Sequence, residues 1–445
     1  MGMKNLFYII LFTTMAFDSH NQNTVSISDL INNSSQSMFD FQNQTIDIDE
    51  TIVIKRSNIT IKNLKINVIS KHKLYDLIIQ LDCDNNRYDN ITINGGGLCN
   101  NGISVYDSKN TSIVNCNITN IGYNNKKVVS SAIRLIGDCS DSEVKNCSIN
   151  VVRSYKNSTG ITISQSLPPK NNIKRYSKRI KIIGCVISNI TSYTNMDADG
   201  IKVLEATGLG TYNRGGHIFR NIIFKNCDKR GLKLQTSDAQ CYNIICESGN
   251  FSQATIDFFG ENPFLDTLKI MNIDMTKHTY GVFLHDFKTA IIKNISANSA
   301  AINNSNKTLI YSENNNSEGK LYISNIDCRG YNMLYRCPPE SKLKSISISD
   351  TNIDVKYHYS LLVNSEVLIL NNFKENTMEF KGWYHTFLAI NDALKIVKSN
   401  SIVVIDKQLF EKISRSEETN MFYRMPDNNG VILLVKNGQI KILEK

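Results

Sequence analysis

Apolar and polar residues alternate along most of the chain between about residue 50 and residue 355. The alternation comes in short runs of roughly four to six residues, which is the period expected of β-strands with one face toward a core. Asn, Gly and Ser separate the runs and predict tight turns. Helical spacing of apolar residues is absent from this region, so the pattern predicts an all-β fold.

These runs belong to a repeated unit. A segment of roughly 23 to 40 residues recurs about nine times, a repeat length typical of solenoids. The clearest copies are "NGISVYDSKNTSIVNCNITN" from Asn101, "SAIRLIGDCSDSEVKNCSIN" from Ser131, "RGLKLQTSDAQCYNIICESGN" from Arg230 and "YGVFLHDFKTAIIKNISAN" from Tyr280. One such coil cannot bury its own apolar face, so stacked coils must supply the core.

Alignment of the copies assigns the two faces of the strand that follows the repeated Gly. Apolar residues such as Ile161, Ile201 and Leu232 are predicted to point inward. Their neighbours point outward and stack about 4.8 Å apart, one residue per coil. The outward file reads Ser104, Arg134, Thr162, Lys202, Lys233, Asp257 and Phe283.

A second column accounts for many of the 11 cysteines. Ile replaces Cys at this position in later copies, so we interpret these cysteines as small buried hydrophobic residues. A turn Asn precedes most of them and is expected to hydrogen-bond along the stack. A disulfide between Cys83 and Cys99, which lie off the column, is left open. The column contains Cys116, Cys147, Cys185, Cys227 and Cys246, followed by Ile273, Ile295 and Ile326.

The "NGI…NC.I.N" coils and the Asn column resemble the right-handed parallel β-helix of the pectate lyase-like superfamily, over about residues 50 to 355. We therefore predict a right-handed parallel β-helix domain over residues 21–358. Residues 25–37 are predicted to form a short helical cap, and residues 359–445 a C-terminal β tail or cap. Within that tail, Asn437–Gly438 predicts a hairpin turn.

The N-terminal residues have the form of a secretory signal peptide. Lys4 precedes an apolar run from Leu6 to Phe17, too short to span a membrane comfortably. We predict a signal peptide over residues 1–20, with a buried N-terminal strand as the alternative. The protein would then be secreted, periplasmic or on the cell surface, and unattached to a membrane once the signal is removed.

The charged residues gather beside the repeated Gly in two coils. "MDADGIKV" carries Asp197, Asp199 and Lys202, and "DKRGLKLQ" carries Asp228, Lys229, Arg230 and Lys233. Stacking should bring these residues to one outward face. The net charge of +9 agrees with an anionic partner.

The resemblance implies a chemistry for this face, because lyases of the superfamily cleave uronic-acid polymers by β-elimination. Such a reaction needs a base and a cation that neutralises the substrate carboxylate. We predict Arg230 and Lys233 in these roles, with Lys202 and Lys229 in support. Asp197, Asp199 and Asp228 are candidate ligands for Ca²⁺, or else they pair with the neighbouring cations and hold no metal.

Two insertions follow the outward-facing strand of adjacent coils, at residues 166–179 and 204–216. Long loops on a rigid scaffold often carry function, so we expect them to stand side by side over the charged face. The predicted substrate-binding residues are Lys174, Arg175, Arg179, Tyr212, Arg214, His217, Tyr280 and His285.

Several functions stay open at this point. The leading hypothesis is a lyase acting on an acidic polysaccharide. A polygalacturonase-like hydrolase is the second, because "MDADG" resembles that family's first motif, but Lys229 and Arg230 stand where its next motif has two carboxylates. The third is a glycan-binding surface or phage-spike-like protein without catalysis. A uronate epimerase shares the first step of a lyase. We expect no nucleic-acid partner, and the oligomeric state is undetermined.

Overall fold

The computed structural model describes residues 26–354, except 71, 123–127, 167–173, 195, 299–306, 315–317, 332, 339–340 and 342. It also describes strands 361–362, 365–375, 401–405, 431–436 and 439–442. The predicted signal peptide lies outside the described residues. In the described part of the chain, no helix has the length and apolarity needed to cross a membrane.

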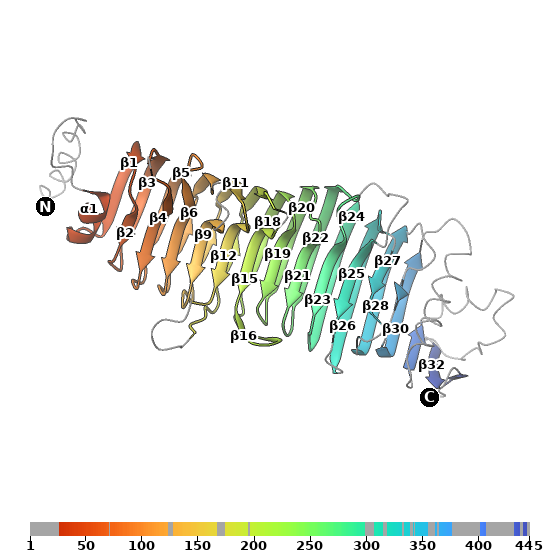
Figure 1. Cartoon of the computed structure of the whole chain (residues 1–445). Helices are drawn as coiled ribbons and strands as arrows, with labels where there is room; N and C mark the ends of the chain where they lie inside the picture. Colours follow the sequence, from red (N-terminus) through yellow and green to blue (C-terminus); the bar gives the residue numbers. More distant parts are fainter. Residues whose placement is uncertain are drawn as a thin grey trace, which may run out of the picture.

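Two long parallel sheets wind along the molecule as a β-solenoid (Figure 1). We call these sheets A and B. Each coil contributes one strand to sheet B and either one strand or two short strands to sheet A. Sheet B contains β2(Ile52–Ile54), β4(Leu74–Leu81), β6(Cys99–Tyr106), β9(Ser130–Ile136), β12(Ser158–Ser164), β15(Ala198–Leu204), β19(Arg230–Gln235), β21(Ala254–Phe259), β23(Tyr280–His285), β25(Thr308–Glu313), β27(Met333–Arg336) and β29(Leu361–Leu362).

Sheet A faces sheet B across the core. Its strands pair in parallel from β1 to β31, and this arrangement confirms the predicted parallel β-helix. Sheet A contains β1(Met38–Ile48), β3(Thr60–Val68), β5(Arg87–Asn94), β7(Ser112–Val114), β8(Asn117–Ile121), β10(Glu143–Lys145), β11(Ser148–Ser154), β13(Lys181–Ile183), β14(Val186–Ser192), β18(Ile218–Cys227), β20(Gln240–Gly249), β22(Phe264–Ile273), β24(Thr289–Asn298), β26(Gly319–Arg329), β28(Leu343–Asp354), β30(Ser365–Glu375), β31(Ser401–Ile405), β32(Val431–Lys436) and β33(Gln439–Ile442).

The predicted inward residues form the core. Ile161, Ile201 and Leu232 are in register on neighbouring strands, and each is fully buried. Burial of one such side chain contributes about 1.5–3 kcal/mol relative to exposure. The stacked apolar files therefore hold the coils together and fix which side chains point outward.

The cysteines are part of this core, as the repeat predicted. All eleven are free and buried, including Cys83 and Cys99, so the disulfide that the sequence left open is not formed. Burial raises the pKa of Cys99 and of Cys139 to about 12. These thiols therefore behave as small hydrophobic side chains.

The turn Asn residues hydrogen-bond along the stack. Asn294 has φ 59°, in the left-handed region that Asn tolerates better than most residues. Its amide nitrogen donates to Asp266 Oδ1 at 2.6 Å, and Asn294 Oδ1 accepts from Asn325 Nδ2 at 2.6 Å. The column thus satisfies side-chain groups at the turns while it aligns successive coils.

Both ends of the solenoid differ from its middle. The predicted N-terminal helix is α1(Ile27–Asn33), capped by the Ser26 hydroxyl, which accepts from the Asp29 amide. At the other end, β31, β32 and β33 pair antiparallel, with Lys436 opposite Gln439. The predicted turn residues 437–438 lie outside the described residues. Parallel stacking continues beyond residue 359, and the domain boundary there stays a prediction.

Candidate functional site

The repeated Gly lets the coils approach closely where the charged residues begin. A Cβ atom on Gly200 would lie 2.3 Å from the Phe224 ring and 2.7 Å from the Gly231 carbonyl oxygen of the next coil. Only Gly fits this approach. The flanking residues are held in register, so Asp199 stands beside Arg230, and Lys202 beside Lys233.

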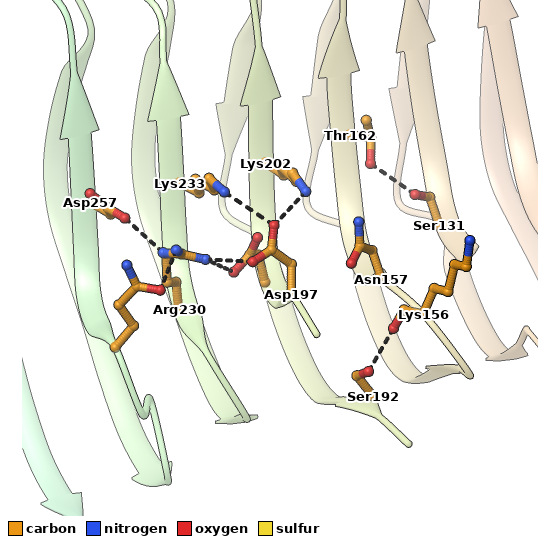
Figure 2. Close-up of polar contacts among 12 residues, drawn as sticks. Ser131, Lys156, Asn157, Thr162, Ser192, Asp197, Lys202, Arg230, Lys233 and Asp257 are labelled. Carbon is orange, nitrogen blue, oxygen red and sulfur yellow. Dashed lines mark hydrogen bonds and ion pairs between the residues drawn. The ribbon is translucent and has the colours of Figure 1, made fainter. Parts of the chain in front are cut away.

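Arg230 is the centre of the resulting group, which we call the charged cluster (Figure 2). Its Nε atom is 2.7 Å from Asp257 Oδ2, and its Nη1 atom is 3.0 Å from Asp199 Oδ1. Nη1 is also 3.1 Å from Asp197 Oδ1, and Nη2 donates to Gln253 Oε1. The charged cluster consists of Asp197, Asp199, Lys202, Arg230, Lys233 and Asp257.

The two lysines of the cluster converge on one carboxylate. Lys202 Nζ is 2.7 Å and Lys233 Nζ is 3.1 Å from Asp197 Oδ2, and Figure 2 shows both ammonium groups pointing toward it. Asp197 precedes β15, and its side chain turns toward the strands of the next coil. With three carboxylates and three cations, the cluster carries no net charge when all six are ionised.

The protonation states follow from this arrangement. Burial acts to lower the pKa of Arg230, but the carboxylates of Asp199, Asp257 and Asp197 together outweigh it. The net pKa is raised, so the guanidinium stays charged. Burial raises the pKa of Asp199 although Arg230 opposes the shift. Burial also acts to raise the pKa of Asp197, yet Lys202, Lys233 and Arg230 together outweigh it and the net pKa is lowered.

This geometry does not support the predicted role of Arg230 as a base or carboxylate clamp. Its side chain is 5% exposed and its hydrogen bonds go to the protein's own carboxylates and amide. Lys202 and Lys233 are likewise bound to Asp197. The sequence placed these residues together correctly, and the alternative that the carboxylates pair with the neighbouring cations agrees with their contacts.

The predicted calcium ligands do not fit a metal site in this arrangement. Asp197 and Asp199 bind cations, and Asp228 lies in a different set of contacts with Asn250. Among the described residues, no group of three or more His, Cys, Asp or Glu side chains could hold a metal ion. The alternative that the carboxylates pair with neighbouring cations describes Asp197 and Asp199.

A pocket lies at the corner that precedes the strands carrying the cluster. We call it the corner pocket, and its volume is about 570 Å³. Lys229 is one residue before Arg230, so the pocket adjoins the charged cluster directly. Its walls come from turns of four successive coils: Ser192, Tyr193, Met196, Asp228, Lys229, Asn250, Ser252 and Lys277.

The corner pocket is positively charged. Within the described residues, neither Lys229 nor Lys277 forms an ion pair or a side-chain hydrogen bond, although both lie near enough to Asp228 to lower its pKa. Burial nevertheless raises the pKa of Asp228 overall. Tyr193 and Met196 are 56% and 48% exposed and offer apolar surface beside the two ammonium groups.

Aromatic side chains cross the outward face of sheet B on the other side of the cluster. The Tyr280 and Tyr311 rings stack with centroids 4.5 Å apart, and Phe283 packs at 5.1 Å from each. His285 stacks on Phe259 at 4.0 Å and hydrogen-bonds Asp257 Oδ1 at 3.0 Å, which joins these rings to the cluster. This aromatic strip consists of Tyr212, Phe259, Tyr280, Phe283, His285 and Tyr311.

The two insertions touch each other, as predicted. Asn213 Nδ2 donates to the Ser177 carbonyl, and the Tyr176 hydroxyl donates to the Ala206 carbonyl. The second insertion contains the antiparallel pair β16(Ala206–Gly208) and β17(Thr211–Tyr212) (Figure 1). However, both insertions leave the ends of β12 and β15, whereas Asp199 and Arg230 lie at strand starts. The described residues of the insertions thus adjoin the ends of these strands that are farther from Asp199 and Arg230.

The predicted substrate-binding residues consequently divide into four sets. Tyr212, Tyr280 and His285 lie in the aromatic strip. His217 is fully buried and hydrogen-bonds Glu205 Oε2 at 2.9 Å, so it anchors the insertion instead of facing a ligand. Lys174 is exposed. The remaining three bind carboxylates near the insertions: Arg175 with Asp107, Arg179 with Asp141, and Arg214 with Asp238 and Glu261.

The fold and this surface define a parallel β-solenoid protein with an elongated outward face that combines charge and aromatic rings. No protein-family model matches the chain, and no curated protein matches it. Membership of the pectate lyase-like superfamily therefore stays a prediction.

Solved structures of similar fold include phage and bacterial surface proteins. The tailspike of E. coli bacteriophage HK620, in complex with a pentasaccharide, has TM-score 0.48 and 11% identity over 85% of this chain and 76% of its own. The Streptococcus pneumoniae adhesin PfbA has TM-score 0.44 and 12% identity over 76% and 89%. ORF18 of Geobacillus virus E2 has TM-score 0.45 and 14% identity, and the match covers 59% of this chain and 50% of that protein. These likenesses concern the fold and carry no inference about ligands.

Proposed function

We propose that the chain binds an acidic glycan along the outward face of sheet B, with an anionic group held in the corner pocket. The observation that carries the proposal is that Lys229 and Lys277 line the same pocket and that neither forms an ion pair within the described residues. A carboxylate or sulfate on a sugar supplies the missing charge. Ammonium groups with solvent access form strong charge-assisted hydrogen bonds to such anions.

The surroundings of the two lysines suit a sugar ring. The exposed Tyr193 ring offers an apolar face, and Ser192, Asn250 and Ser252 offer hydrogen-bonding groups for hydroxyls. The aromatic strip extends the binding surface into the following coils. Its residue Tyr280 lies directly beside the preceding coil, because its backbone amide donates to the Gln253 carbonyl. A polymer that starts in the corner pocket thus meets the partly exposed rings of Phe259, Tyr280 and His285 in the following coils, whereas Phe283 and Tyr311 are buried.

Binding without cleavage agrees best with the charged cluster. A hydrolase needs one carboxyl to give a proton and another to activate water. Here Asp197 and Asp199 accept from the same guanidinium nitrogen of Arg230. The cluster accordingly acts as a rigid, neutral support for the binding surface, and a secreted or cell-surface location would give the protein access to extracellular glycans.

Binding assays with single-lysine variants test this proposal. Polygalacturonate, alginate and hyaluronate serve as acidic probes, and dextran serves as the neutral probe. We expect at least one acidic probe to bind, and Lys229→Ala and Lys277→Ala each to weaken binding about tenfold, the loss of one charge-assisted contact. Lys225→Ala is the matched control, since Lys225 lies on sheet A and pairs with Glu247. Equal affinity in all three variants would refute the assignment.

β-Elimination is the second candidate function, and Lys229 is the observation that favours it. Of the four cations predicted to be catalytic, it alone has an ammonium free of ion pairs within the described residues. In its neutral form, Lys229 would take the C5 proton of a uronate held by Lys277. The C4–O bond would break, a C4=C5 double bond would form, and the leaving oxygen would take a proton from solvent.

Product analysis separates the two functions. A lyase produces an unsaturated uronate that absorbs in the ultraviolet, and Lys229→Ala would abolish its formation while Lys225→Ala would not. Binding of an acidic probe without this product leaves the glycan-binding function alone. New reducing ends without the absorbance would instead indicate hydrolysis.

A further inference from the structure

A second pocket lies on the opposite side of the solenoid, where the chain turns from sheet B into sheet A. Its volume is about 460 Å³, and it is bounded by the starts of β20, β22 and β24. Neither the charged cluster nor the corner pocket shares a residue with it. The residues that determine its chemistry are Asp238, Gln240, Tyr242, Asn262, Phe264 and Ile291.

The pocket has an aromatic wall on a surface that otherwise faces solvent. The Tyr242 and Phe264 rings are 5.3 Å apart, between centroids, and tilted by 46°. Ile291 continues the apolar surface and is 36% exposed. The Tyr242 and Phe264 rings are only partly buried, so a ligand that covered them would remove further apolar surface from water.

Cations fix the two rings from outside the pocket. The Arg220 guanidinium carbon lies 4.8 Å from the Tyr242 centroid, and Lys293 Nζ lies 5.3 Å from the Phe264 centroid. Lys293 is also 3.0 Å from Asp266 Oδ2, which neutralises it. The rings are therefore held in place before any ligand arrives.

The polar wall is oriented in the same way. The Tyr242 hydroxyl donates to Gln240 Oε1 at 2.9 Å, and Asn262 Nδ2 donates to Asp238 Oδ1 at 2.9 Å. These bonds leave the Gln240 amide nitrogen and the Asn262 amide oxygen without a partner in the described chain. The pocket thus presents one fixed donor and one fixed acceptor beside its rings.

We propose that this pocket binds one neutral pyranose residue, such as a hexose or an N-acetylhexosamine. An apolar ring face would lie on Phe264 and Tyr242, and hydroxyl groups would meet Gln240 and Asn262. The lining contains no cation to pair with an acidic sugar, and its one carboxylate, Asp238, already pairs with Arg214 at 3.8 Å. The site is thus complementary to the corner pocket, and it stands whether or not an acidic glycan binds on sheet B.

Saturation-transfer NMR with neutral hexasaccharides tests the proposal on the full chain. The probes are maltohexaose, cellohexaose, mannohexaose and chitohexaose. We expect at least one to bind, and Phe264→Ala and Tyr242→Ala each to weaken it about tenfold, as expected for loss of an aromatic contact. Tyr322→Ala is the matched control, because Tyr322 is 43% exposed on the same sheet but outside the pocket.

Two further variants keep the test decisive. Phe264→Leu retains apolar volume without the flat ring, so it reports on binding even when Phe264→Ala does not fold. Lys229→Ala reports on the corner pocket. The proposal is overturned when none of the probes binds, when Phe264→Leu and Tyr242→Ala bind as well as the unaltered chain, or when Lys229→Ala removes binding of the neutral probes.

Discussion

Replacement of Arg230 with Met tests whether the charged cluster is a structural element. Met retains an unbranched apolar side chain but removes the charge and every donor. Asp199 and Asp257, both fully buried, would then lose their only guanidinium contact. Removal of one partner from a buried ion pair typically costs about 3–5 kcal/mol, because the remaining charge is left without compensation. We expect a loss in that range at neutral pH.

The loss should depend on pH in a definite direction. Without the guanidinium, which opposes the effect of burial in the unaltered chain, the folded-state pKa of Asp199 rises further above about 3.9, the value in the unfolded chain. The folded variant then binds more protons than the unfolded one between these pKa values, so its stability falls as the pH rises through that window. The loss of unfolding free energy relative to the unaltered chain is expected to be small near pH 4 and to reach about 3–5 kcal/mol near pH 7.

Urea unfolding followed by circular dichroism measures both effects at constant ionic strength. Lys225→Met is the control, because Lys225 and Glu247 form an exposed pair at 3.2 Å, worth less than about 1 kcal/mol. The m-values must agree for the comparison to hold. A deficit below about 1 kcal/mol for Arg230→Met, or the same deficit at both pH values, would refute the view that the cluster is buried and compensated.

Two other buried features lead to measurable outcomes. Burial lowers the pKa of His278 to about 4 from 6.5, so the unfolded state binds more protons and stability falls as the pH drops through this range. His278→Gln, which still reaches the Tyr331 hydroxyl and the Phe251 carbonyl, should flatten that slope in acid titrations of stability, and an unchanged slope would contradict it. The eleven cysteines should not react with a thiol reagent such as dithionitrobenzoate in the folded chain and should all react in urea. Rapid modification of any cysteine before unfolding would be inconsistent with the burial of all eleven thiols.

The fold could be predicted because its cause is local and repeated. Alternating residues such as Ile161 and Ile163 leave one face apolar, and the repeat specifies which residues stack. In-register parallel stacking then places Asp199 beside Arg230, and Lys202 beside Lys233, although each pair is 31 residues apart. The same reasoning placed Cys116, Cys147 and Cys185 in one column, but it was wrong for Cys227 and Cys246, which pair with Ile190 and Phe224 at other repeat positions.

The site was predicted only in part, because its key contacts come from turns. The repeat fixes where a strand residue points, but it does not fix Asp197, which precedes β15 and turns its carboxylate toward Lys202 and Lys233. Gln253, Tyr193 and Lys277 likewise lie in turns of different coils, and the alignment assigned them no face. Phe283 stood in the predicted outward file, yet its packing with Tyr280 and Tyr311 depends on two coils together.

The insertions illustrate the same limit. A charged loop beside charged strands suggested a roof over the site, but a strand places its two ends far apart. Glu205 follows β15 at once. Its Oε2 atom binds His217, Thr236 and Asn213, and its Oε1 atom accepts from the Ser177 backbone amide. This fully buried carboxylate ties the second insertion to the scaffold at the end of the strands remote from Asp199.

The charged cluster is neutral and its residues bind one another, which limits how the ligand specificity of this surface can change. Arg230 and its three carboxylates support one another, so replacing any of them disturbs the others and the stability of the coil. Lys229, Lys277 and Tyr193 do not stabilise the fold in this way, because they lie in turns and face solvent. Substitutions there can alter which anion binds at little structural cost. Specificity on this face is therefore expected to depend on the turns, while the strands keep the charges that the fold itself requires.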